Sequence, residues 1–256
     1  VVQEDLQRAA APYGLRFGPD PSSSSRCTIG GMIGNNACGT RALGYGRTSD
    51  NLAGLRAITG SGQSWDAAPI QDGLRGVARA GLATIRTEFG RFSRQVSGYA
   101  LENLLPEKGF GVQGLLAGSE GTLAVITEAT VRLVSEPAHR VLVVLGYPDI
   151  AAAGDATPLV LGYGPVACEG IDSRIVDVVR ERRGPRAVPP LPRGAAWLFV
   201  ELTGADPGEL FLRAGELGNG CGAMDSMVVP DTGRAAALWR IRADGAGLSG
   251  RSPAGR

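Results

Sequence analysis

Histidine, aromatic residues and paired cysteines are scarce in this chain. It has one histidine, 5% aromatic residues and four cysteines, none of them in a CxxC pair. A Ser-His-Asp triad or a site with several histidine ligands therefore has almost nothing to draw on, and we predict no metal site. We interpret the cysteines as reduced, partly buried thiols of a cytosolic protein: Cys27, Cys38, Cys168 and Cys221.

The chain also lacks an excess of charge of either sign and any long apolar run. With 26 basic against 25 acidic residues, nothing favours an electrostatic grip on nucleic acid or anionic lipid, and we expect neither as a partner. No apolar run is long enough to span a membrane, and no signal peptide is apparent. The 256 residues, 43% of them apolar, are enough for one large or two modest globular domains.

Glycine, by contrast, is abundant, with 39 residues, and it gathers in two stretches. The first follows Pro19-Asp20-Pro21-Ser22 and covers residues 28–39; the second begins at Gly118-Ser119-Glu120-Gly121-Thr122 and leads into an alternating apolar strand. Glycine lets the backbone approach an anion or a ring closely. The ordered pair predicts two walls of one elongated cofactor site.

Apolar spacing predicts a succession of short elements. We expect helices over 3–11, 74–87, 149–156, 173–182, 207–217 and 233–242, and strands over 52–59, 123–134, 140–146, 159–168, 196–202 and 223–229. Residues 28–33 fit either a helical turn or a close-packed loop. The strand–helix rhythm of the second half indicates an α+β unit, with a boundary near Glu136-Pro137.

These residues resemble FAD-linked oxidases of the vanillyl-alcohol oxidase type. That group includes the glycolate oxidase flavin subunit, D-lactate dehydrogenases and D-2-hydroxyglutarate dehydrogenases, and the chain is most similar to its iron–sulfur-fused bacterial branch. The resemblance rests on five motifs: Pro19-Asp20-Pro21-Ser22, Thr28-Ile29-Gly30-Gly31, Asn35-Asn36-Ala37-Cys38-Gly39, Tyr45-Gly46 and Gly118-Ser119-Glu120-Gly121-Thr122-Leu123.

The resemblance implies an α+β fold in two parts. Residues 1–137 would form the second lobe of a PCMH-type FAD-binding domain, without its N-terminal pyrophosphate-loop lobe. Residues 138–256 would form part of an α+β, ferredoxin-like substrate domain, truncated at its C-terminal end. We therefore expect an internal piece of a longer polypeptide, without the family's pyrophosphate loop, His-x-His cluster or iron–sulfur cysteines.

The resemblance also assigns residues to the site. FAD would be bound by small or polar residues of the motifs: Asp20, Pro21, Ser22, Thr28, Gly30, Gly31, Asn35, Asn36, Ala37, Cys38, Gly39, Glu120, Gly121, Thr122 and Ile126. Trp239-Arg240-Ile241-Arg242 resembles a Trp-x-x-Arg element whose arginine pairs with the substrate carboxylate. A guanidinium suits a carboxylate, so Arg242 is the candidate catalytic residue.

Four of these residues have simpler interpretations that stay open. Glu120 could hold its own turn through backbone N–H groups rather than contact flavin. Asp20, between two prolines, could be a turn former. Cys38 could be a small buried residue rather than a ring contact, and Arg242 could be a surface charge near a helix end.

The leading hypothesis is an FAD-dependent dehydrogenase that oxidises a small (R)-2-hydroxy acid such as D-lactate, glycolate or D-2-hydroxyglutarate. Electrons would pass to an iron–sulfur domain or subunit, or to a quinone-linked acceptor. We expect a cytoplasmic protein, attached peripherally to the inner membrane through that acceptor. The alternative is a catalytically inactive flavoprotein fragment that acts at most as a binding module. A nicotinamide-dependent Rossmann enzyme fits poorly, because no GxGxxG turn joins a strand to a helix.

Overall fold

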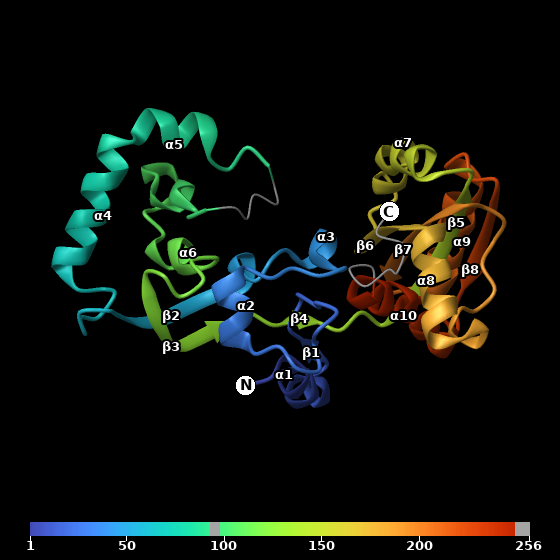
Figure 1. The fold of residues 1–256 in the computed structure, drawn as a ribbon, viewed down its shortest axis with the longest axis horizontal. Coiled ribbons are helices and arrows are strands. Elements are labelled where there is room, and N and C mark those ends of the chain that lie inside the picture. The colour runs from blue at the N-terminus through green and yellow to red at the C-terminus, as the bar shows by residue number, and fades with distance from the viewer. Residues whose placement is uncertain (93–97, 249–256) are drawn as a thin grey trace. The chain divides into compact units, whose positions relative to one another are not determined.

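A computed structural model describes residues 1–92 and 98–248 of the chain (Figure 1). It forms two compact units: the first comprises residues 1–39 and 45–136, and the second comprises residues 40–44 and the chain from Pro137 onward. The chain thus divides between Glu136 and Pro137, while the short segment 40–44 joins the second unit. The functional labels of the two predicted domains stay predictions, and residues 249–256 of the second lie outside the described residues.

The first unit is built from short helices and two small antiparallel sheets, β1–β4 and β2–β3. The turn over 60–63 is closed by the Thr59 N–H bonding the Gln63 carbonyl at 2.9 Å, and a core around Trp65 and Leu116 lies beneath β2–β3. In chain order the helices and strands through Ser135 are α1 (Gln3–Ala10), η1 (Ala11–Tyr13), β1 (Leu15–Arg16), α2 (Ile29–Asn35), α3 (Ala42–Tyr45), η2 (Ser49–Asn51), β2 (Leu52–Thr59), α4 (Ala68–Ala80), α5 (Leu82–Glu88), η3 (Leu101–Leu104), η4 (Pro106–Lys108), α6 (Val112–Leu116), β3 (Ala124–Val131) and β4 (Val134–Ser135).

The second unit is one four-stranded sheet with helices on both faces. Its strand order is β6-β7-β5-β8, and every neighbouring pair is antiparallel. The elements are β5 (His139–Tyr147), α7 (Ile150–Leu161), β6 (Ala167–Asp172), α8 (Ser173–Arg183), η5 (Pro185–Ala187), β7 (Ala196–Gly204), α9 (Pro207–Gly220), β8 (Asp225–Val229) and α10 (Thr232–Leu248).

Alternation along the buried central strands gives this sheet two apolar faces. Val143 and the other side chains on its face of the sheet pack against α7 and α9. Leu142 and the other side chains on the opposite face pack against α8 and α10. The crossover β5–α7–β6 skips β7, and β7–α9–β8 skips β5, with both crossover helices on one face. This is the ferredoxin-like arrangement, so the predicted α+β fold class is confirmed, with α8 and α10 added on the other face.

Several predicted elements are wrong in extent. The helices expected over 149–156 and 233–242 continue to Leu161 and Leu248. The strand expected over 159–168 does not form, because α7 continues through Pro158 to Leu161 and β6 begins only at Ala167. Burial of Ala153 and Val160 against the sheet outweighs the one backbone bond that proline removes. The helix expected over 74–87 is two helices that meet at Gly81, and the strand expected over 123–134 ends at Val131.

Among the described helices, none combines the length and apolar character needed to cross a membrane. The four cysteines are free thiols. Within residues 1–92 and 98–248, no three His, Cys, Asp or Glu side chains come together as metal ligands would.

Candidate functional site

Both glycine-rich segments belong to the first unit, and they are bonded to each other. The first folds into α2, whose N-terminal cap is Thr28; its hydroxyl accepts the Gly31 N–H at 3.1 Å. The helix ends at Asn35, and its C-cap Asn36 takes the left-handed conformation (φ 48°) that asparagine tolerates. This tight ending turns the chain toward the small residues 37–39.

The second segment docks on the C-terminal end of α2. The Gly118 N–H donates to the Ile33 carbonyl and the Glu120 N–H to the Gly34 carbonyl, both at 2.9 Å. The Asn35 side-chain amide donates to the Glu120 carboxylate at 2.7 Å. The two backbone bonds engage carbonyls of the last turn of α2, where intrahelical donors become scarce. The predicted meeting of the two segments is therefore present in the structure.

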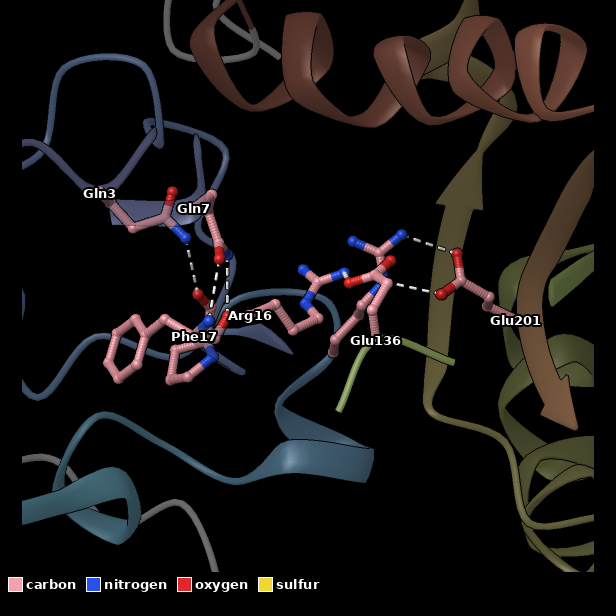
Figure 2. A network of polar contacts seen from close by, with 8 residues as sticks. Gln3, Gln7, Arg16, Phe17, Glu136 and Glu201 are labelled. Atoms are coloured by element: carbon pink, nitrogen blue, oxygen red, sulfur yellow. Dashed lines mark hydrogen bonds and ion pairs between the residues drawn. The ribbon is translucent and has the colours of Figure 1, made fainter. Parts of the chain in front are cut away.

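The Pro19–Ser22 segment lies against the same region and is held by α1 (Figure 2). Gln7 makes two bonds at 2.8 Å, donating to the Phe17 carbonyl and accepting the Phe17 N–H, and Gln3 donates to the Pro19 carbonyl at 3.1 Å. A Cβ at Gly39, whose φ is +117°, would overlap the Asp20 carbonyl. Only glycine allows this approach, which places the 19–22 and 35–39 motifs side by side.

Thr48 and Ser49 hold the 35–39 motif through hydrogen bonds. The Ala37 carbonyl accepts the Thr48 N–H at 2.9 Å and the Thr48 hydroxyl at 2.6 Å. The buried Asn36 side chain accepts the Ser49 N–H at 3.0 Å. Burial opposes ionisation of Asp50, but its bonds from the Arg47 side chain and backbone outweigh burial and lower the pKa of this carboxyl.

The backbone is open at three glycines of these elements. No atom lies within 4 Å of the position that a Cβ would take at Gly30, Gly34 or Gly121. Gly30 and Ile126 also line one groove of about 300 Å³. A flat prosthetic group needs such bare backbone, so the residues present fit the predicted FAD wall on steric grounds.

The remaining predicted residues have mixed settings. Thr122 is exposed; its hydroxyl donates to the Ser119 carbonyl at 2.5 Å and lies 2.8 Å from the Tyr99 hydroxyl. Ser22 is exposed, and Pro21 and Cys38 are half-buried. Glu120 bonds Asn35 from a left-handed conformation (φ 54°), which gives it a structural role in the turn. Whether any of these residues contacts FAD stays a prediction.

Arg242 lies in the second unit, on α10. Its guanidinium donates to the Glu169 carboxylate of β6 at 3.1 Å, and both side chains are about a quarter exposed, at 25% and 28%. One turn earlier, Trp239 packs edge-on against Phe199, with ring centroids 5.7 Å apart. Arg242 thus already binds a carboxylate, which is the chemistry predicted for it, but its catalytic role stays a prediction.

Sequence reasoning missed the pair formed by Arg41 and Glu201. Arg41 donates from Nε and Nη2 to the two oxygens of Glu201, at 2.6 and 2.8 Å (Figure 2). Glu201 is 4% exposed. The sequence signal was that Glu201 lies among the apolar residues of β7. A carboxylate buried in this way requires a partner, which could have prompted a search for one.

Two protein families match the chain. Residues 1–67 match the FAD binding domain family, and residues 136–254 match the C-terminal domain of FAD linked oxidases. The chain belongs to the FAD-linked oxidases. The predicted family is therefore confirmed, and FAD is the cofactor of the domain that residues 1–67 match.

Curated relatives of this FAD-linked oxidase include enzymes of two names. It is 30% identical to the D-2-hydroxyglutarate dehydrogenase of Escherichia coli (strain K12) over 71% of the chain and 20% of the relative. It is 30% identical to the D-lactate dehydrogenase of Archaeoglobus fulgidus over 88% of the chain and 42% of the relative. The chain thus spans less than half the length of either protein.

A solved structure supports the fold. An alkyldihydroxyacetonephosphate synthase superposes with a TM-score of 0.59 over 94% of the chain and 41% of that protein, at 15% identity. At this identity the likeness concerns the fold alone. It extends over both units of the FAD-linked oxidase.

Proposed function

We propose that this chain contributes an FAD wall and a substrate anchor to a dehydrogenase of small (R)-2-hydroxy acids. The observation that carries the proposal is the bonding of the 118–120 turn to the end of α2. It brings together the glycine-rich segments needed for one long cofactor. The names of the D-2-hydroxyglutarate and D-lactate dehydrogenase relatives support the substrate class.

The residues proposed to hold FAD are the motif residues 20–22, 28, 30, 31, 35–39 and 120–122, with Ile126. The bare backbone at Gly30, Gly34 and Gly121 would let the cofactor lie close, and Gly39 keeps the 19–22 segment in place. When bound, the flavin supplies the hydride acceptor for 2-hydroxyacid oxidation. The chain's own contribution is to shape that slot and to exclude water from it.

Arg242 is proposed to orient the substrate through its carboxylate. In the structure Arg242 binds Glu169, so a substrate carboxylate would take the place of the Glu169 carboxylate. An arginine fork fixes a carboxylate in one plane, which would hold the α-carbon of the hydroxy acid in a single orientation.

The electron acceptor and the location belong to the same proposal. We expect an iron–sulfur domain or subunit, or a quinone-linked carrier, to receive the electrons. We further expect a cytoplasmic protein that meets the inner membrane only through that acceptor. The resemblance to the iron–sulfur-fused branch supports both.

A glycine pair tests the FAD wall. Gly30→Val places a side chain on the proposed wall, whereas Gly73→Val adds the same side chain to α4; neither Cβ meets an atom within 4 Å. We expect titrated FAD to bind the unmodified chain and the Gly73 variant equally, with a shifted flavin spectrum. The Gly30 variant should bind at least about tenfold more weakly, a loss of roughly 1.4 kcal/mol.

Two outcomes contradict the proposal. An unmodified chain that leaves the flavin spectrum unchanged has no FAD wall, and equal binding by both variants places the wall elsewhere. With FAD bound, D-lactate, glycolate and D-2-hydroxyglutarate are then tested for bleaching of the flavin absorbance. FAD binding without bleaching by any of them would favour the inactive binding module.

A further inference from the structure

In the second unit, α8 and α10 lie side by side on one face of the sheet (Figure 1). A Cβ at Gly245 of α10 would overlap the Ile175 side chain of α8, so glycine allows the two helices to approach closely there. The chain leaves α8 through Gly184, whose φ of 89° favours glycine, and then enters the short helix η5. The end of α8, η5 and one face of α10 line a common groove.

This groove has the size of a small-molecule site and a charged lining. Its volume is about 520 Å³, which lies within the range of pockets that hold small ligands. The charged residues that line it are Arg183 of α8, Arg186 of η5, and Arg240 and Asp244 of α10. The other lining residues are alanines and a proline, so no large apolar side chain fills the space.

Positive charge exceeds negative charge along the groove. Asp244 accepts a hydrogen bond from Arg183 Nη2 at 3.2 Å. In the part of the chain that the structure describes, neither Arg186 nor Arg240 has an acidic partner. Three arginines against one carboxylate leave the lining with a surplus of two positive charges. Because like charges gathered along one groove repel each other, a bound anion would lower the energy of this arrangement.

We propose that the groove binds a small phosphate monoester. A phosphate monoester carries about two negative charges at neutral pH and three acceptor oxygens, which matches the surplus charge of the lining. The three arginines come from three different elements, so their guanidinium groups approach a bound phosphate from different directions, whereas a carboxylate offers only two oxygens. The small lining residues leave room for the organic part of the ester.

The groove is separate from the site of the proposed function. Neither Arg242 nor any residue of the proposed FAD wall lines it. Every residue that lines it belongs to the second unit. The proposal therefore goes beyond hydroxy-acid oxidation, and its test needs neither FAD nor catalytic activity.

Calorimetric titration of the 256-residue chain at low salt tests the proposal, with ribose 5-phosphate as the probe and ribose as the uncharged control. We expect ribose 5-phosphate to bind and ribose not to bind. Arg186→Gln and Arg240→Gln should each weaken binding about tenfold, because each removes a charged donor. Arg234→Gln is the matched control: it removes the same charge from α10 outside the groove and should leave binding unchanged.

A variant of opposite sign distinguishes a phosphate site from a merely structural ion pair. Asp244→Asn removes the carboxylate from the groove lining and should tighten ribose 5-phosphate binding about fivefold, since a negative charge near the phosphate is lost. Weaker or unchanged binding by this variant would overturn the proposal. So would equal weakening by the Arg234 and Arg240 variants, or no binding of ribose 5-phosphate by the unmodified chain. Inorganic phosphate bound as tightly as the ester would overturn the assignment to an ester.

Discussion

Burial is the main cause of the raised pKa values of Cys168 and Tyr147. Cys168 packs beside the core that also contains Tyr147 and Cys221. Burial raises the pKa of the Cys168 thiol to about 11 and that of the Tyr147 hydroxyl to about 12. Tyr147 also donates to the Cys221 carbonyl at 3.0 Å. These groups remain neutral at physiological pH and are structural.

We therefore expect Cys168 to resist alkylation. A rise from the ordinary value of 9.0 to about 11 lowers the thiolate fraction near pH 8 by about a hundredfold. Mass spectrometry of iodoacetamide-treated chain should show Cys168 labelled at least that much more slowly in the folded chain than in urea. Equal labelling in both states would contradict the assigned burial. Because the folded pKa is raised, stability from this thiol is present below pH 9 and lost as pH rises toward 11.

Sequence patterns anticipated some residues of the candidate site and missed others. The glycine-rich motifs were predictable because a cluster of glycines usually marks a tight turn or a place where the backbone closely approaches another group. The roles of Gln3, Gln7 and Arg41 were not, since each acts on a partner distant in sequence: Pro19, Phe17 or Glu201.

Among elements, the 19–22 and 35–39 segments depend on each other through one glycine. Gly39→Ala should destabilise the chain by about 2 kcal/mol or more, because the left-handed φ and the overlap with the Asp20–Pro21 peptide both disfavour a side chain. Gly62→Ala is the control, since Gly62 also has a positive φ but no atom within 4 Å of its Cβ position. It should cost about 1 kcal/mol.

Urea denaturation of the two variants separates these contributions. An equal loss of stability at Gly39 and Gly62 would mean that the two segments do not pack as described. A larger loss at Gly39 accompanied by weaker FAD binding would tie the packing to the proposed site.

Elements were predictable where local preference and tertiary packing agree. The strand over 52–59 has the predicted bounds. Its alternating pattern indicates a strand, and the glycine-rich turn that follows indicates that the strand ends at Thr59. The 159–168 strand failed because Pro158 suggests a helix end, whereas the sheet stabilises α7 beyond it. When local preference and packing disagree, burial against the rest of the fold decides the structure. That burial is not visible in a single sequence.

For the whole molecule, the second unit is incomplete without residues from the first half of the chain. A piece that starts at Pro137 retains the buried Glu201 but lacks Arg41. An uncompensated buried carboxylate costs about 3–5 kcal/mol. We therefore expect residues 137–256 alone to be much less stable than the same piece with Glu201→Leu.

Thermal unfolding of the two pieces checks this expectation. The leucine variant should have the higher Tm in the isolated piece. A higher Tm for the isolated piece with Glu201 intact would contradict the stated cost of the unpaired carboxylate.

The place of residues 40–44 in the second unit has a further consequence for synthesis on the ribosome. Residues 40–44 emerge long before any strand of the sheet on which they rest. Vectorial folding, with each domain closing as it appears, cannot complete this molecule. Arg41 therefore stays without its Glu201 partner until β7 has been translated.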